Sequence, residues 1–152
     1  MKIKLIYPKW PKLRNQPEFN LPPHGPVCFA ACLPKDVEIS FCDENVEELI
    51  FDSDADLVCL SVMLTCQLPR GWEIADAYRA MGKCVIFGGI AAMLHYEETI
   101  KHADSVFLGE AEGRMEQVLQ DFSRGALQKI YDFLHDFPDT KLIGTARRDI
   151  LK

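Results

Sequence analysis

Residues 57–62 read Leu57-Val58-Cys59-Leu60-Ser61-Val62, a run that is apolar at nearly every position. A strand that is buried on both faces of a parallel sheet has this nearly continuous apolar composition. The run is short, and the polar stretch 54–56 precedes it, so it predicts a strand rather than a helix. We therefore expect it to lie near the centre of a parallel sheet.

Four further short apolar runs are spread along the chain. They occupy residues 3–7, 37–41, 84–87 and 105–108. The segments that follow the runs predict helices over residues 27–33, 46–51, 69–81, 95–102 and 114–122. Alternation of strand and helix is typical of an α/β protein whose parallel sheet is covered on both faces.

Ligands of such sheets bind outside the carboxyl ends of the strands, so the loops that follow the strands are the places to search for a site. The pair Gly88-Gly89 lacks side chains and lets a ligand approach the backbone closely. Ser61 and Thr65 supply hydroxyls after the central strand, and Gly109 with Glu110 repeats the small-then-polar order. Each residue alone also fits a tight turn or a satisfied core hydroxyl. Together they predict a ligand site.

Size and charge exclude several classes. A chain of 152 residues predicts one domain with a core of its own. A net charge of -6 argues against nucleic-acid binding through phosphate neutralisation. No uncharged apolar stretch approaches the ~18 residues of a membrane span. Residues 1–4 lead directly into a strand pattern without a signal-peptide core, so we expect a cytoplasmic protein.

A pair of cysteines, Cys28 and Cys32, has the C-x3-C spacing. The iron–sulfur motif of radical S-adenosylmethionine (SAM) enzymes continues as C-x3-C-x2-C, but Lys35 stands at the third position. That cluster is therefore not expected in this chain. The spacing places both thiols on one face of a helix, and core packing is favoured over redox or metal chemistry.

The pattern changes after residue 122. Residues 123–152 contain Gly125, Pro138 and Gly144 and are locally basic at the end. They are expected to form a linker or arm rather than another strand-and-helix unit. We also expect the chain to be the N-terminal part of a longer protein.

Four motifs, taken in order and spacing, resemble those of a known family. They are Leu21-Pro22-Pro23-His24-Gly25-Pro26, Asp56-Leu57-Val58-Cys59-Leu60-Ser61-Val62, Val85-Ile86-Phe87-Gly88-Gly89 and Asp104-Ser105-Val106-Phe107-Leu108-Gly109-Glu110-Ala111-Glu112. Over residues 1–122 the chain resembles the N-terminal cobalamin-binding domain of B12-dependent radical SAM enzymes. Residues 146–151 are similar to the segment that enters the radical SAM barrel in that family.

The resemblance implies a flavodoxin-like or Rossmann-like three-layer sandwich of about five parallel strands in the order 2-1-3-4-5. It implies cobalamin bound at the carboxyl edge of the sheet by residues 1–122. The implied cofactor-binding residues are Pro23, His24, Gly25, Ser61, Met63, Thr65, Gly88, Gly89, Ile90, Gly109, Glu110 and Glu112.

For the whole protein the resemblance implies a methyltransferase or a related enzyme. Residues 123–152 would lead to a radical SAM domain that is absent from this chain and would carry a 4Fe–4S cluster and SAM. The chain alone is not expected to be an enzyme, and its expected partners are cobalamin and that domain.

Two features distinguish this chain from other cobalamin domains. The D-x-H-x-x-G string, whose histidine binds cobalt, does not occur, and His24 lacks the upstream Asp. The resemblance therefore implies cobalamin held without a histidine or any other protein ligand to cobalt. The family's G-E-G-E reads Gly109-Glu110-Ala111-Glu112 here, and five residues, 90–94, separate Gly89 from the next histidine.

The residues that other functions of this fold class require are missing from this chain. A receiver domain needs acidic residues after the first and third strands, where Pro8-Lys9 and Ser61 stand. A flavodoxin phosphate loop and a G-x-G-x-x-G dinucleotide loop are also missing after the first strand. The alternative from another class is a noncatalytic interaction domain that has lost the cofactor, with Trp10, Phe19 and Leu21 as contact residues.

Overall fold

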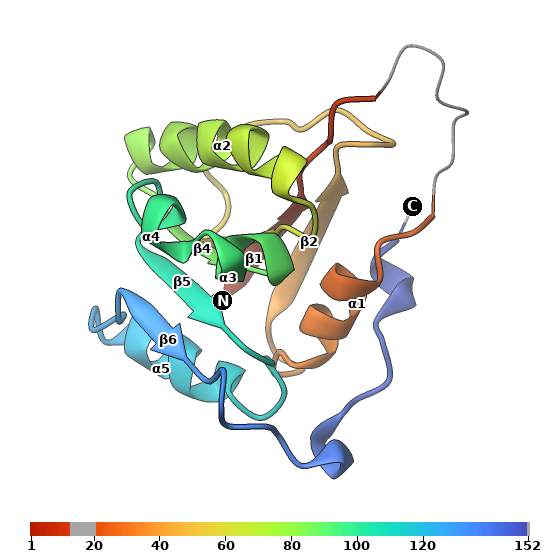
Figure 1. The fold of residues 1–152 in the computed structure, drawn as a ribbon, viewed down its shortest axis with the longest axis vertical. Coiled ribbons are helices and arrows are strands. Elements are labelled where there is room, and N and C mark those ends of the chain that lie inside the picture. Colours follow the sequence, from red (N-terminus) through yellow and green to blue (C-terminus); the bar gives the residue numbers. More distant parts are fainter. Residues whose placement is uncertain (13–20, 152) are drawn as a thin grey trace.

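Six parallel strands form one sheet in the order β2-β1-β3-β4-β5-β6 (Figure 1). The computed structural model describes residues 1–12 and 21–151. The strands are β1 (Lys2–Tyr7), β2 (Glu38–Asp43), β3 (Leu57–Ser61), β4 (Cys84–Gly88), β5 (Ser105–Leu108) and β6 (Ile130–Asp132). The apolar run at 57–62 forms β3, which pairs with β1 on one side and β4 on the other.

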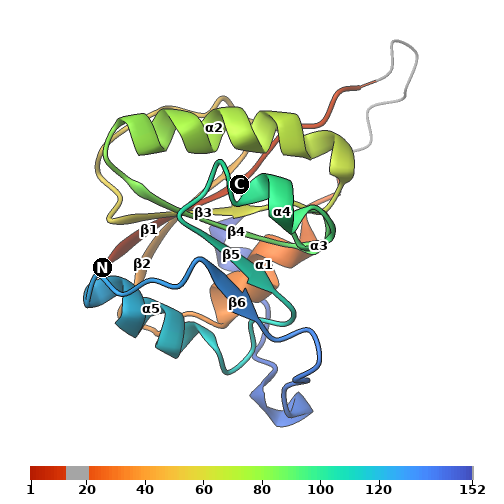
Figure 2. The same ribbon diagram turned by 60° about the vertical axis from the view of Figure 1, so that its left-hand side comes forward.

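Helices cover both faces of the sheet, as Figures 1 and 2 show. One face carries α2 (Leu68–Ala80), α3 (Ile90–Leu94) and α4 (Tyr96–Thr99), and the other carries α1 (His24–Ala31) and α5 (Met115–Ser123). Short 3-10 turns lie at η1 (Thr65–Gln67), η2 (Thr140–Leu142) and η3 (Arg148–Ile150). None of the helices in the described ranges is long and apolar enough to cross a membrane.

The alternation of side chains along the strands divides the core into two layers. In β3, Val58 and Leu60 face α2, whereas Leu57 and Cys59 face α1 and α5. All four side chains are almost fully buried, and β3 is the strand for which burial on both faces was predicted. The three-layer sandwich is thus confirmed.

The strand count differs from the expected one. The first five strands and their order are as predicted, but the segment expected to be a linker contributes β6 to the sheet. β6 pairs Ile130, Tyr131 and Asp132 with β5, and only Tyr131 is fully buried. Three residues are too few to display a strand's alternation in the sequence, so the pattern gave no signal.

The helix predicted over 46–51 is absent. The chain turns after β2, where the Asp43 carboxylate accepts hydrogen bonds from the backbone and side chain of Asn45, and then runs without helix to β3. Lys4 Nζ donates to the carbonyl oxygen of Ile50 at 2.7 Å, which holds the loop against β1. The helix predicted over 95–102 was also placed wrongly, because helical turns lie at 90–94 and 96–99 with a break at His95.

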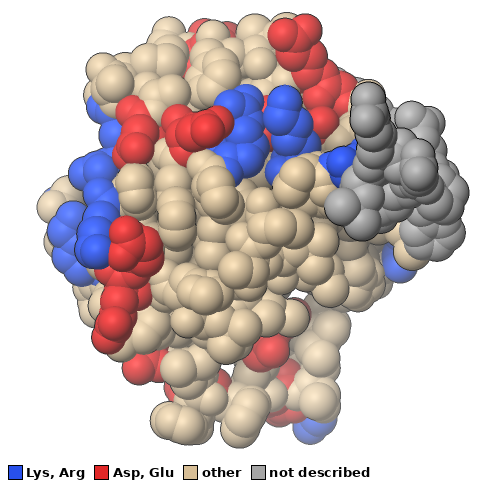
Figure 3. Space-filling model, turned by 45° about the horizontal axis from the view of Figure 1, so that its top comes forward, with Lys and Arg blue, Asp and Glu red and all other residues tan. Residues whose placement is uncertain are grey.

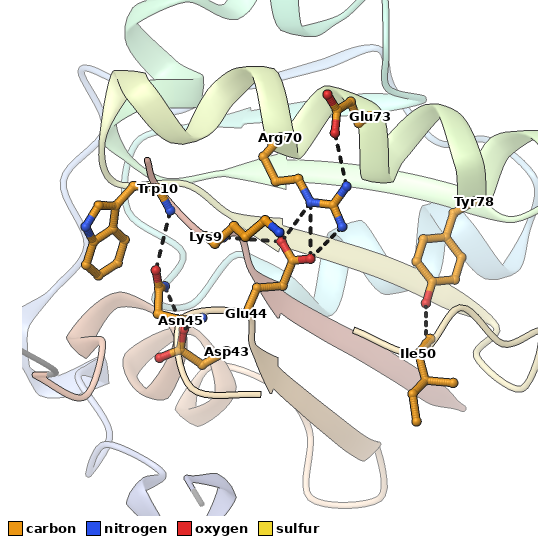
Figure 4. A network of polar contacts seen from close by, with 9 residues as sticks. All are labelled: Lys9, Trp10, Asp43, Glu44, Asn45, Ile50, Arg70, Glu73 and Tyr78. Carbon is orange, nitrogen blue, oxygen red and sulfur yellow. Dashed lines mark hydrogen bonds and ion pairs between the residues drawn. The ribbon is translucent and has the colours of Figure 1, made fainter. Parts of the chain in front are cut away.

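Polar contacts fasten the loops at the carboxyl ends of β1 and β2 (Figure 4). Arg70 of α2 donates from Nε and Nη2 to the buried carboxylate of Glu44, with a shortest distance of 2.7 Å. Glu44 also accepts a hydrogen bond from the backbone N–H of Lys9. The fully buried side chain of Gln67 joins two loops, because its Nε2 donates to Pro8 O and its Oε1 accepts from the backbone of Met63 and Leu64. Side-chain hydrogen bonds therefore hold the loops at this edge of the sheet in place.

Candidate functional site

A cavity of about 480 Å³ lies between the sheet and α1 at the carboxyl ends of the strands. Its floor takes one side chain from each of four neighbouring strands. These are Leu5 of β1, Cys59 of β3, Ile86 of β4 and Phe107 of β5. All four are nearly buried, and Leu5, Cys59 and Ile86 stand in register. The cavity therefore has an apolar floor built on the four central strands of the sheet.

The floor ends at Ser61 and Gly88, which pair as the last residues of β3 and β4. A Cβ atom on Gly88 would meet no other atom within 4 Å. Gly88 follows Ile86 by two residues, so a side chain at this position would point to the cavity side of the sheet. Gly25 of α1 lies close by, since a Cβ there would stand 3.4 Å from Ser61 Oγ. These residues leave room at the mouth of the cavity.

The neighbouring glycines have a different role. Gly89 has φ 95°, and a Cβ there would lie 2.5 Å from the carbonyl oxygen of Val62. That close approach carries hydrogen bonds, because Val62 N donates to Gly88 O and Ala91 N donates to Val62 O. Gly109 has φ 102°, and a Cβ there would lie 2.8 Å from the backbone of Phe133. The fold itself requires glycine at 89 and 109, although both residues also line the cavity.

α1 supplies a wall with two thiols. Cys28 of α1 and Cys32, the residue that caps the C-terminal end of α1, both line the cavity, as expected for residues four apart along a helix. His24 Nε2 lies 3.2 Å from Cys28 Sγ, and Cys32 Sγ donates to the carbonyl oxygen of Cys28. Burial and the nearby Glu112 raise the pKa of Cys28, and they raise the pKa of Cys32 to about 12. Both thiols are therefore neutral at pH 7 and form a weakly polar surface.

The opposite wall is acidic. Glu110 and Glu112 belong to the loop between β5 and α5, and both line the cavity beside Ala111 and Met115. Among the described residues that line the cavity, none is Lys or Arg. Carboxylates only accept hydrogen bonds, so this wall suits a ligand that presents N–H groups rather than one recognised through phosphate alone.

The structure brings most of the predicted site residues together. The cavity is lined by His24, Gly25, Ser61, Gly88, Gly89, Ile90, Gly109, Glu110 and Glu112. Three others lie outside its lining. Pro23 is buried in a neighbouring depression beside Phe41, Met63 is exposed, and Thr65 Oγ1 lies 3.4 Å from His95 Nε2.

Sequence reasoning did not predict the floor of the cavity, the thiols Cys28 and Cys32, which were expected to pack in the core, or Ile143. Cys59, Ile86 and Phe107 each precede a predicted loop residue by two positions, so the alternation of side chains along a strand could have identified them.

Phe19, a contact residue in the alternative interpretation, lies outside the described residues. Ile143 lines the cavity from the far end of the chain, and no local pattern marks it.

Comparison with known proteins assigns the family. The family model for the B12 binding domain matches residues 13–119. The chain belongs to the B12-binding domain family. The matched range includes Cys59, Ile86 and Phe107 of the cavity floor, the α1 wall and the acidic wall, whereas Leu5 of the floor precedes it. It ends before β6 and Ile143.

Two methyltransferases of Chlorobaculum tepidum are similar to this B12-binding domain. Bacteriochlorophyllide d C-8(2)-methyltransferase is 35% identical over 111 residues, which cover 72% of this chain and 24% of the relative. Bacteriochlorophyllide d C-12(1)-methyltransferase is 28% identical over 107 residues, covering 69% of this chain and 23% of the relative. The chain thus spans about a quarter of the length of these relatives. No solved structure matches it.

Proposed function

We propose that the chain binds cobalamin with its nucleotide tail in the cavity and its corrin ring across the carboxyl edge of the sheet. The observation that carries the proposal is the apolar floor on four strands, which ends in the unobstructed Gly88. The cavity volume of about 480 Å³ is in the range of small-molecule sites. Whole cobalamin is larger than this volume, so the cavity would enclose only part of it.

The walls fit the polar groups of this cofactor. Cobalamin carries amide side chains around the corrin ring, and Glu110 and Glu112, which line the cavity, would accept hydrogen bonds from their N–H groups. The Ser61 hydroxyl can donate or accept at the end of β3. No Cβ at Gly88 obstructs the space between these groups.

Around the mouth of the cavity the edge of the sheet offers an apolar surface. Ile90 and Leu94 of α3 and Met63 of the β3–α2 loop are more than half exposed. The centre of the face in Figure 3 carries no Lys, Arg, Asp or Glu, which gather toward its margins. A large flat macrocycle gains from such a surface, because covering exposed apolar atoms removes them from water.

We propose further that the protein supplies no imidazole to cobalt. His24 is the one histidine among the described lining residues, and its Nε2 lies 3.2 Å from Cys28 Sγ. Bound cobalamin supplies methyl-transfer or redox chemistry at cobalt. The chain's own residues bind and orient the cofactor, and the floor excludes water from one side of it.

For the whole protein we propose a cytoplasmic B12-dependent radical SAM enzyme that transfers a methyl group. The names of both relatives support methyl transfer, and the chain covers about a quarter of their length. Residues 1–122 would form the cobalamin-binding domain. Residues 123–152 would lead from it to a radical SAM domain that holds the 4Fe–4S cluster and SAM.

A direct binding experiment tests the cofactor proposal. The purified chain is mixed with hydroxocobalamin and passed through a gel-filtration column. We expect cobalt absorbance to elute with the protein and its visible spectrum to shift. Elution of all cobalamin at the small-molecule volume would contradict the proposal and favour the alternative, an interaction domain that has lost the cofactor.

A further inference from the structure

Residues 133–151 leave the sheet after β6 and pass along the outer side of α1 (Figures 1 and 2). We call this segment the strap. We propose that the strap is part of the cofactor site and sets the rate at which cobalamin leaves the cavity. The proposal rests on the proposed function, and it concerns residues beyond the family match, which ends at residue 119.

The first part of the strap is fixed to the acidic wall of the cavity. Phe133 N donates to Leu108 O at 2.9 Å, and the Phe133 ring lies 5.5 Å from that of Phe107 in the cavity floor. The Arg114 guanidinium lies over the Phe133 ring and forms an ion pair with Asp136. The strap therefore begins directly behind the loop that holds Glu110 and Glu112.

The middle of the strap reaches the cavity. Leu142 contacts the backbone at Gly113, where an added Cβ would lie 2.8 Å from Leu142 Cδ1. Ile143 lines the cavity and is 57% exposed, which places it at the mouth rather than in the interior. Gly144 lies against Ala31 of α1, because a Cβ there would stand 3.4 Å from the Ala31 carbonyl oxygen.

The last part of the strap is fixed to α1 and to the segment before it. Arg147 N donates to the carbonyl oxygen of Val27 at 2.9 Å. Leu151 packs against the core layer that faces α1 and α5, and it borders the depression beside Pro23 and Phe41. The helix that forms one wall of the cavity is therefore held between the sheet and the strap.

Through these contacts the strap controls the release of cobalamin from the cavity. A ligand held between the sheet and α1 leaves through the mouth of the cavity or by displacing α1, and the strap contacts both the mouth and α1. Ile143 is the residue of the described strap that lines the cavity, so it can contact the ligand directly. Loosening the strap should increase the dissociation rate, where most differences in affinity between related complexes lie.

The test compares two substitutions within the strap of the full chain. Ile143→Asp places a charge at the mouth of the cavity, whereas Phe137→Asp changes a side chain that is 80% exposed and does not line it. Dissociation of hydroxocobalamin is followed by visible absorbance during a chase. We expect about a tenfold faster release from Ile143→Asp and parent behaviour from Phe137→Asp. Equal release rates for the parent and Ile143→Asp would overturn the proposal.

A second measurement needs no cobalamin. Iodoacetamide labelling of Cys28 and Cys32, read by peptide mass spectrometry, reports how well the strap closes the cavity, with the exposed Cys66 as internal reference. Gly144→Val adds two methyl groups beyond a Cβ that would already stand 3.4 Å from the Ala31 carbonyl oxygen. We expect this crowding to loosen the strap, and we expect Gly144→Val and Ile143→Asp to label both cysteines several-fold faster than the parent. Unchanged labelling contradicts a closing role for the strap. A parent that binds no cobalamin but shows this labelling refutes the proposed function while leaving the closure intact.

Discussion

Two adjacent glycines at the carboxyl end of β4 have separate roles. Gly88 opens onto free space, whereas Gly89 has a positive φ and touches the backbone of Val62. We expect Gly88→Val to fold like the parent and to bind cobalamin at least about tenfold more weakly, because its methyl groups occupy the cavity mouth. Gly89→Val should instead lose about 2 kcal/mol or more of unfolding free energy, since φ 95° and ψ 164° suit glycine alone.

Thermal melting and cobalamin titration of both variants distinguish these roles. Cobalamin affinity of Gly88→Val equal to that of the parent would place the site elsewhere. A Gly89→Val variant that melts with the parent would show that the backbone near Val62 adapts without cost.

His24 is the histidine whose substitution tests whether the protein supplies an imidazole to cobalt. We expect bound cob(II)alamin to have its own base displaced into the cavity with the nucleotide tail. Because His24 Nε2 lies close to Cys28 and the D-x-H-x-x-G string is missing, we expect no imidazole nitrogen in its place. Electron paramagnetic resonance measures this directly, because an axial nitrogen splits the cobalt lines into triplets. His95→Ala is the matched control, as His95 lies at the same edge but contacts Thr65. Triplets in the parent that vanish in His24→Ala but persist in His95→Ala would establish histidine ligation.

At the scale of the elements, a loop replaces the helix predicted after β2. Residues 44–56 return to β3 without a helix, and Lys4 of β1 holds them by pairing with Asp52. Burial is the largest single influence on the pKa of Lys4 and lowers it, but the hydrogen bonds and charges of Asp52 and Tyr78 together outweigh burial and raise that pKa. The same hydrogen bond lowers the pKa of Asp52. The loop thus supplies a carbonyl oxygen and a carboxylate to the buried Lys4.

The pair predicts a pH dependence. A lowered carboxyl pKa adds stability that is complete above the unfolded-state pKa, near 4, and is lost as the pH falls through the folded-state pKa. A raised lysine pKa adds stability that is lost only as the pH rises through a value above 10.5. We therefore expect the contribution of Asp52 to unfolding free energy to be constant from pH 5 to 9.

Asp52→Asn should cost about 1 kcal/mol at pH 7, a modest figure because the Asp52 side chain is 37% exposed to solvent. Urea unfolding at pH 7 and pH 3 measures the effect. The difference between parent and variant should shrink at pH 3, where the parent's carboxyl is largely protonated. Asp54→Asn, at an exposed carboxylate two residues away, should show neither effect. A difference that grows at pH 3 would contradict this assignment.

At the scale of the whole molecule, burial decides what the sequence predicts. β1, β3, β4 and β5 are apolar runs because both their faces are covered, and such runs are visible without any knowledge of the fold. The loops at their carboxyl ends predicted most of the cavity's lining for the same reason. β6 and Ile143 depend on contacts between distant parts of the chain, with β5 and with the cavity mouth. Those contacts leave no local pattern, so the sequence predicted an arm where the structure has an edge strand and a strap.

The last prediction concerns the stability of the whole fold. A cofactor in this cavity would contact the sheet, α1, the β5–α5 loop and the strap at once, so its binding should stabilise all of them together. At a free concentration a hundredfold above Kd, a ligand that binds only the folded state adds about 2.7 kcal/mol. For a domain of this size that corresponds to a rise in Tm of roughly 5–10 °C.

Melting curves with hydroxocobalamin and with methylcobalamin measure this rise, and Gly88→Val is the control because it keeps the fold but fills the mouth of the cavity. We expect a rise for the parent that is much smaller for Gly88→Val at the same concentration. An equal rise in both proteins would mean that cobalamin binds away from the cavity. The absence of any rise with both forms at saturating concentration would show that this chain does not hold the cofactor by itself.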